Sequence, residues 1–118
     1  MIHCITRHQT NARMSRIVVH AGTVHLAGVV AADRSGDIKA QTTEVLRRID
    51  ELLVSAGSDK TRLLTAQIWL KDIANDFEGM NAVWDTWLPQ GCAPTRATCQ
   101  ALLGAPDMLV EVIVTAAA

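Results

Sequence analysis

The sequence has no tyrosine, one phenylalanine and three tryptophans among its 118 residues. Side chains that stack on bases are therefore scarce, and a net charge of −1 leaves no basic stripe for phosphate contacts. No apolar run approaches the roughly 20 residues of a membrane-spanning helix. The first residues also lack the basic start and apolar core of a signal peptide. We expect neither a nucleic-acid partner nor a membrane partner.

Cysteine is also sparse: the chain has three, an odd number, and none are spaced as Cys-x-x-Cys. Free thiols are typical of a reducing compartment, so we expect a cytoplasmic protein. His3, Cys4 and His8, even together with His20 or His25, fit no standard metal-binding spacing. We predict no metal and no other cofactor.

Apolar residues, in contrast, make up 49% of the chain, against 19% charged residues. This balance is typical of a globular protein, and the length predicts a single domain over residues 1–118. Alternating or continuous apolar residues predict six strands. They are expected at 2–6, at two places within 15–31 that are joined by a turn at 20–23, and at 61–70, 94–101 and 108–114. Apolar residues repeated every three or four positions predict helices at 38–57, ended by Gly57, and at 75–88.

The predicted order is β-β-β-α-β-α-β-β. Crossovers of one hand place both helices on one face of the sheet, so we expect an α+β fold with a six-stranded mixed sheet. The opposite face still carries apolar side chains, because Leu109 and Ile113 alternate with valines in the last strand. A monomer would leave a wide apolar patch in water. We therefore expect this face to pack against other subunits.

Two charges stand out in strands that otherwise look buried, Arg96 and Glu111. Desolvation costs several kcal/mol per ion, so each charge needs a partner. One explanation is a structural ion pair between two strands of a hairpin. The other is a ligand site at the sheet edge or a subunit boundary. There the planar guanidinium would bind a carboxylate through two hydrogen bonds, and the glutamate would polarise a water molecule.

Four segments resemble, in order and spacing, the YjgF/RidA family of reactive-intermediate (enamine/imine) deaminases. The most specific is PTRATCQALLGAPDMLVEVIVTAA, which resembles the closing signature of the family. VHLAGVVA resembles its Val-Ser-Gly strand, and QTTEVLRRIDELLVSAGSDKTRLL resembles its Gln-Thr helix. IWLKDIANDFEGMNAVWDTW resembles its strand, Asp turn and second helix. The resemblance therefore covers nearly the whole chain.

The resemblance implies a chorismate-mutase-like fold and a homotrimer with clefts at the subunit boundaries. It also implies hydrolysis of 2-imino or 2-enamino acids to 2-oxo acids and ammonia without a cofactor. By position, Arg96 matches the carboxylate-binding arginine and Glu111 the glutamate associated with the water. Asn81 matches an asparagine near the cleft, and Gly28 a glycine whose backbone lines it.

The sequence departs from the family where its well-known members carry a tyrosine close to the ligand. That position is Met14 here, which we predict to line the substrate site, and Ala27 replaces the usual serine before Gly28. These departures keep a second function open, a non-catalytic trimer that binds small carboxylates or 2-oxo acids. The ribonuclease activity ascribed to some relatives is disfavoured by the missing basic stripe.

Overall fold

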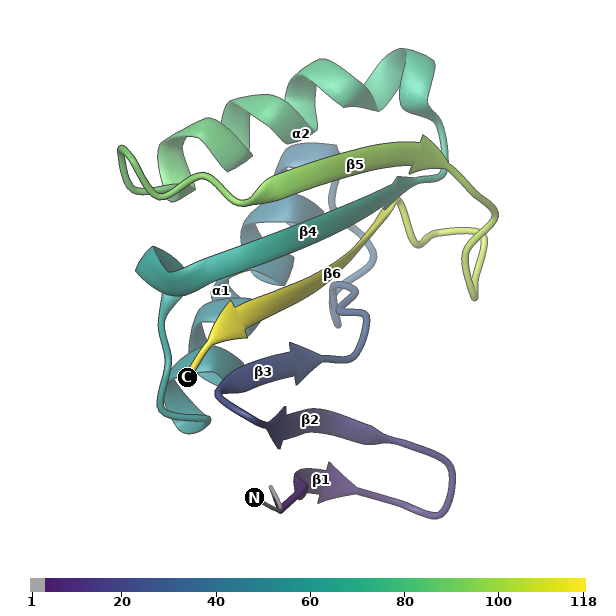
Figure 1. Ribbon diagram of the computed structural model, residues 1–118. Helices are drawn as coiled ribbons and strands as arrows, with labels where there is room; N and C mark the ends of the chain where they lie inside the picture. The colour runs from purple at the N-terminus through teal and green to yellow at the C-terminus, as the bar shows by residue number, and fades with distance from the viewer. Residues whose placement is uncertain (1–3) are drawn as a thin grey trace.

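The computed structural model describes residues 4–118 and consists of one mixed sheet with both helices packed on the same face (Figure 1). The strands are β1 (Thr6–Thr10), β2 (Ser15–His20), β3 (Thr23–Leu26), β4 (Leu63–Leu70), β5 (Thr95–Gln100) and β6 (Val110–Ala117). The helices are α1 (Ile38–Ser55), α2 (Ile73–Trp87) and the single 3-10 turn η1 (Lys60–Arg62). The strand order is β1-β2-β3-β6-β4-β5, and β4 and β5 are the parallel pair. The predicted α+β architecture is confirmed.

Helix boundaries follow from local capping chemistry. The Asp37 side chain accepts a hydrogen bond from the Ala40 amide at 2.9 Å and starts α1, and Asp72 caps α2 in the same way. Helix α1 ends at Ser55, and Gly57 follows with φ of 81°, a conformation that glycine adopts without strain. The predicted end of the first helix is therefore confirmed.

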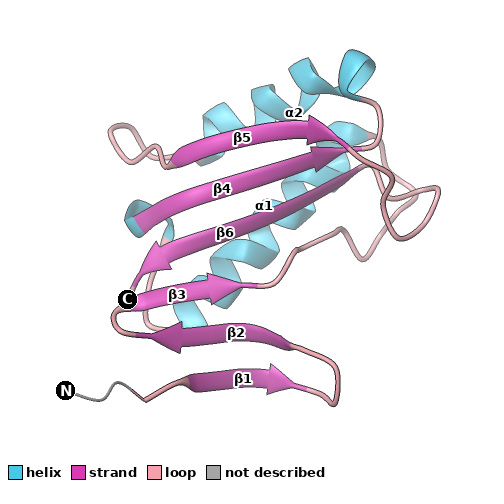
Figure 2. Ribbon diagram, turned by 45° about the vertical axis from the view of Figure 1, so that its right-hand side comes forward, coloured by secondary structure: helices cyan, strands magenta, loops and turns pink. Residues whose placement is uncertain are grey.

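The core lies between the helices and the sheet, mainly over the interior strands β4 and β6. Alternate side chains of β6, including Val110 and Val112, point towards the helices and are at most 1% exposed. Ile68 of β4 and Ile49 of α1 are fully buried against them. Figure 2 shows that no helix covers the opposite face. On that face Trp69 and Ile113 stay half-buried in the isolated chain.

The turn predicted at 20–23 is confirmed, since β2 and β3 are joined by Ala21 and Gly22, both with positive φ. The first strand was predicted too early: β1 covers Thr6–Thr10, and the predicted residues before Cys4 lie outside the described part. Its position is set by pairing with β2, from Thr6 opposite Val19 to Thr10 opposite Ser15.

The hairpin predicted for the last two strands is wrong, because β4 lies between β5 and β6. Side-chain polarity explains this order. Strand β6 is buried on the face towards the helices and half-buried on the other, which suits an interior position, whereas β5 (TRATCQ) is mostly polar and exposed and suits an edge.

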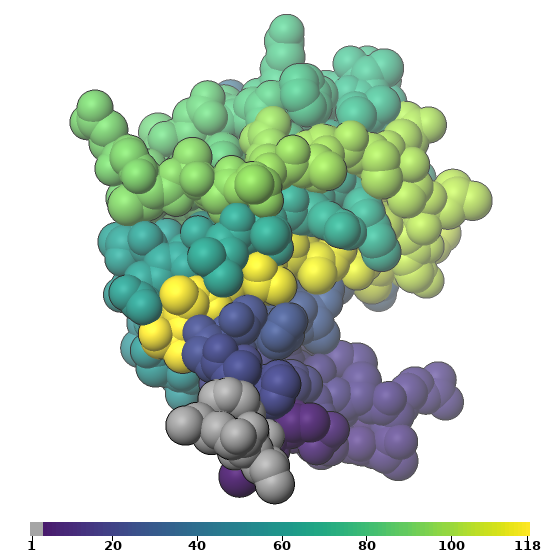
Figure 3. All heavy atoms as spheres, viewed as in Figure 1, coloured from purple at the N-terminus to yellow at the C-terminus, as the bar shows by residue number. Residues whose placement is uncertain are grey.

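The β1–β2 hairpin forms the other edge of the sheet and projects from the body. In the space-filling view a hollow separates it from the β5–β6 loop (Figure 3). Within residues 4–118, no helix combines the length and apolar character required to cross a bilayer.

Candidate functional site

Arg96 lies on the edge strand β5 and faces the helical layer. It pairs with Ala66, which is buried beneath the helices, so the two side chains share that face. The guanidinium carbon lies 5.5 Å from the centre of the Trp84 ring and 6.0 Å from the centre of the Phe77 ring. These cation–π contacts hold a charge that forms no ion pair with any acid among residues 4–118. The guanidinium fork is therefore free to bind an anion.

Asn81 belongs to the same cluster. Phe77, Asn81 and Trp84 lie four and three residues apart on α2, so one face of the helix presents all three towards β5. The Asn81 Oδ1 atom is buried and has no hydrogen-bond partner, and the same is true of Thr98 Oγ1, two residues after Arg96. Leaving a polar atom buried and unpaired costs about 1–3 kcal/mol. Two such oxygens at the α2–β5 interface therefore mark a place where a ligand or a water molecule would bind.

Glu111 lies on the opposite face of the sheet, next to Gly28. Its neighbours Val110 and Val112 face the helices, so the glutamate points to the uncovered face. A Cβ atom added to Gly28 would lie 2.1 Å from Glu111 Oε2, so the carboxylate occupies the space that a side chain at position 28 would fill. Within the described chain no group donates a hydrogen bond to this carboxylate, and burial raises the pKa of Glu111.

The structure therefore separates the two charges instead of pairing them. Arg96 lies beside Ala66, which lies beside Val114, three residues beyond Glu111. With a rise of about 3.3 Å per residue and about 4.8 Å between strands, the two Cα atoms are about 14 Å apart. The side chains also point to opposite faces, so a structural ion pair within one chain is ruled out.

Met14 lies in the turn between β1 and β2 and is 41% exposed. Asn11 Oδ1 accepts hydrogen bonds from the amides of Arg13 and Met14 at 2.8 and 2.9 Å, which fixes this turn. The Ala27 amide donates to Arg16 O at 2.9 Å, so the turn lies at the end of the sheet that also holds Gly28 and Glu111. The structure thus divides the predicted site residues into two groups, Arg96 with Asn81 and Gly28 with Glu111 and Met14, and we refer to each group as a candidate half-site.

Sequence reasoning missed three members of the Arg96 half-site, namely Thr98, Phe77 and Trp84. Thr98 could have been found, because residues two apart in a strand share a face. The aromatic pair has helical spacing, which predicts core packing as readily as a shelf for arginine. Among residues 4–118 no group of three metal-binding side chains is present, and His3 lies outside that range.

Comparison with known proteins identifies the family. The family model described as Endoribonuclease L-PSP matches residues 4–118. The chain belongs to this family. A similar protein is the RutC family protein YoaB of Escherichia coli (strain K12). It is 41% identical over 113 residues, which cover 96% of this chain and 97% of YoaB.

Solved structures agree with the assignment to the Endoribonuclease L-PSP family. A crystal structure of a YjgF family member from Neisseria meningitidis has a TM-score of 0.93 and 38% identity, and covers 97% of this chain and 94% of that one. A rat protein named 2-iminobutanoate/2-iminopropanoate deaminase is 30% identical over 92 residues, covering 73% of this chain and 66% of the rat protein. The family resemblance inferred from the four sequence segments is therefore confirmed.

Proposed function

We propose that this protein hydrolyses reactive 2-imino and 2-enamino acids to 2-oxo acids and ammonia, in clefts shared between the subunits of a homotrimer. The observation that carries the proposal is the Arg96 guanidinium, which lies against the Trp84 and Phe77 rings and forms no ion pair with any acid among residues 4–118. A substrate carboxylate fits its planar fork through two parallel hydrogen bonds. A cytoplasmic location, where the three free cysteines stay reduced, is part of the same proposal.

The Arg96 half-site also offers hydrogen-bond acceptors beside the bound substrate carboxylate. A 2-imino acid carries a protonated nitrogen on the carbon next to its carboxylate. Asn81 Oδ1 and Thr98 Oγ1 are buried and lack partners near Arg96. Either oxygen would accept a hydrogen bond from the iminium N–H, which favours an imino acid over a simple carboxylate.

The Glu111 half-site supplies the proton chemistry. A carboxylate with a raised pKa that accepts no protein hydrogen bond is suited to take a proton from an attacking water. Water adds to the electrophilic imine carbon, and its proton passes by way of Glu111 to the nitrogen. The carbon–nitrogen bond then breaks while the hydroxyl group gives its remaining proton to Glu111, so ammonia leaves and the carbonyl of the 2-oxo acid forms. The ammonia takes up that proton and restores the Glu111 carboxylate. An enamine first takes up a proton on carbon to become the imine.

The separation of the half-sites supports a shared cleft. Arg96 and Glu111 of one chain are about 14 Å apart on opposite faces, so they cannot act on one small molecule. Val18, Trp69 and Ile113 remain half-buried on the face that no helix covers. Packing this face against two copies would bury these side chains and let Arg96 of one subunit approach Glu111 of its neighbour.

A competition assay tests the activity. An amino-acid oxidase generates the imino acid in the presence of semicarbazide, which traps it, and the added protein competes with the trap. A deaminase lowers the rate of semicarbazone formation in proportion to its concentration. If the protein binds a 2-oxo acid but leaves the trapping rate unchanged, it is instead the non-catalytic trimer that binds small carboxylates or 2-oxo acids. Met14, which replaces the family's tyrosine, favours this second function.

A further inference from the structure

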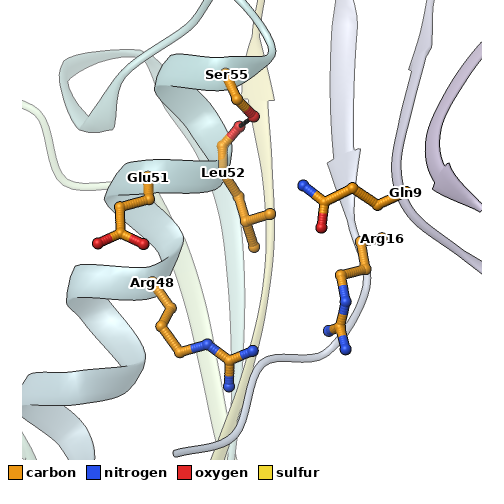
Figure 4. A pocket seen from close by; sticks show the side chains of 6 residues that line it. All are labelled: Gln9, Arg16, Arg48, Glu51, Leu52 and Ser55. Carbon is orange, nitrogen blue, oxygen red and sulfur yellow. Dashed lines mark hydrogen bonds between the residues drawn. The ribbon is translucent and has the colours of Figure 1, made fainter. Parts of the chain in front are cut away.

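A polar groove lies between α1 and the β1–β2 hairpin, and contains none of the residues of the two half-sites. Its volume is about 210 Å³. The lining residues are Gln9, Arg16, Arg48, Glu51, Leu52 and Ser55. Figure 4 shows Arg48 entering from the helix and Arg16 from the strand, with both guanidinium groups reaching towards the same end of the groove.

The acids around the groove are engaged elsewhere. Glu51 Oε1 accepts from Arg47 Nη1 at 2.9 Å, on the outer side of α1. Glu44, one turn before Arg48, accepts two hydrogen bonds from backbone amides. Arg48 donates to a backbone carbonyl, and within the described range neither Arg16 nor Arg48 forms an ion pair. The groove therefore holds two guanidinium groups without an ion-pair partner among the described residues. The pKa of Glu44 is lowered first by its two amide hydrogen bonds and to a smaller extent by Arg48, so this acid offsets only part of the Arg48 charge.

Gln9 provides an independent sign of a site. Its φ is 51°, in the left-handed region that a non-glycine residue occupies at a cost of about 1–3 kcal/mol. The pairing of β1 with β2 includes His8 and Thr10 but skips Gln9, and the Gln9 side chain lines the groove beside Arg16. Strained backbone of this kind clusters at ligand-binding positions.

We propose that this groove binds a phosphate group, either inorganic phosphate or a small phosphomonoester. Two guanidinium forks match the several oxygens of a phosphate dianion, and the Gln9 amide adds a further donor. An anion between Arg16 and Arg48 also removes the repulsion between the two cations. This site goes beyond the proposed imine hydrolysis and does not depend on it.

Calorimetric titration of the intact protein with inorganic phosphate, at constant ionic strength set by chloride, tests the proposal. A second titration uses glycerol phosphate, and the tighter of the two ligands identifies a free ion or an ester. We expect saturable binding in the millimolar range or tighter. Arg16→Gln and Arg48→Gln should each weaken it at least about tenfold, as expected for loss of a charge-assisted pair.

Arg7→Gln is the matched control, because Arg7 lies on the same hairpin, is exposed and does not line the groove. It should leave phosphate affinity unchanged, whereas Glu51→Gln, which removes an acid from the groove, should strengthen binding. Thermal melts verify that each variant is folded, and Arg16, being exposed, can be replaced without opening the core. Unsaturable binding, or an equal loss in Arg7→Gln and Arg16→Gln, would overturn the proposal.

Discussion

Gly28→Ala should inactivate the protein by displacing the Glu111 carboxylate. The new Cβ atom would lie 2.1 Å from Glu111 Oε2, whereas ordinary contact begins near 3.4 Å, so the carboxylate must move by more than 1 Å. A displacement of about 1 Å at a catalytic group can cost roughly 100-fold in rate. Stability should change little, because Gly28 does not have a positive φ and the displaced group is the end of a flexible side chain. Alanine also restricts the unfolded chain by about 0.4–1 kcal/mol, which offsets the repacking.

The assay is imine hydrolysis in competition with semicarbazide, together with a thermal melt and a titration with a 2-oxo acid. We expect a kcat about 100-fold lower, a Tm within about 5 °C of the parent and retained carboxylate affinity through Arg96. Gly104→Ala is the control, since its Cβ would meet nothing closer than 3.6 Å. In a Glu111→Gln background Gly28→Ala should cause no further loss. Normal turnover by Gly28→Ala would refute the role of Glu111 as placed here.

Four other predictions concern single residues. Arg96→Ala should weaken the binding free energy of a 2-oxo acid by about 2–5 kcal/mol, and the affinity of Arg96→Lys should lie between those of Arg96→Ala and the parent. Arg96→Ala should still melt at the parent's temperature, because no acid of its own chain loses a partner. A large fall in Tm would instead indicate that Arg96 is a structural ion. Phe77→Leu, at an exposed position, should weaken the same affinity about two- to fivefold by removing one ring beneath the guanidinium; unchanged titrations would dismiss this shelf. Burial raises the pKa of Glu111 in the folded protein, so the ionised carboxylate lowers the free energy of unfolding when the pH is above that pKa. Glu111→Gln should therefore have a higher Tm than the parent at neutral pH, and this difference should shrink as the pH falls. A lower Tm of Glu111→Gln at neutral pH would contradict the burial argument. Met14→Tyr should change the preference among imino acids without changing the fold, and identical kinetics across several substrates would place Met14 outside the site.

The sequence predicted the layers of the fold better than the order of its strands. Helix periodicity and Gly57 after the helix were enough to place α1. The neighbours of β5 and β6 were predicted wrongly, because closeness in sequence favours a hairpin and pairing across the sheet leaves no local signal. The polarity of β5 was the available clue, since a strand carrying an arginine, two threonines and a glutamine suits an edge.

The site followed a similar pattern. Residue identity marked Arg96 and Glu111 as unusual, because charges are rare in strands that otherwise look buried. Their placement on opposite faces depends on the insertion of β4 between their strands, which residue spacing alone does not reveal. The buried oxygens of Asn81 and Thr98 depend on how α2 packs on β5, a tertiary detail without a sequence pattern.

Subunit complementation tests the shared cleft most directly. Arg96→Ala and Glu111→Gln are each expected to be inactive, and the two proteins are mixed in equal amounts, unfolded and refolded together. If a site takes Arg96 from one subunit and Glu111 from its neighbour, about a quarter of the sites in randomly assembled trimers combine two intact half-sites. Imine hydrolysis should then return to roughly that fraction of the parent activity. Mixed trimers, verified by mass, that remain inactive would contradict the account.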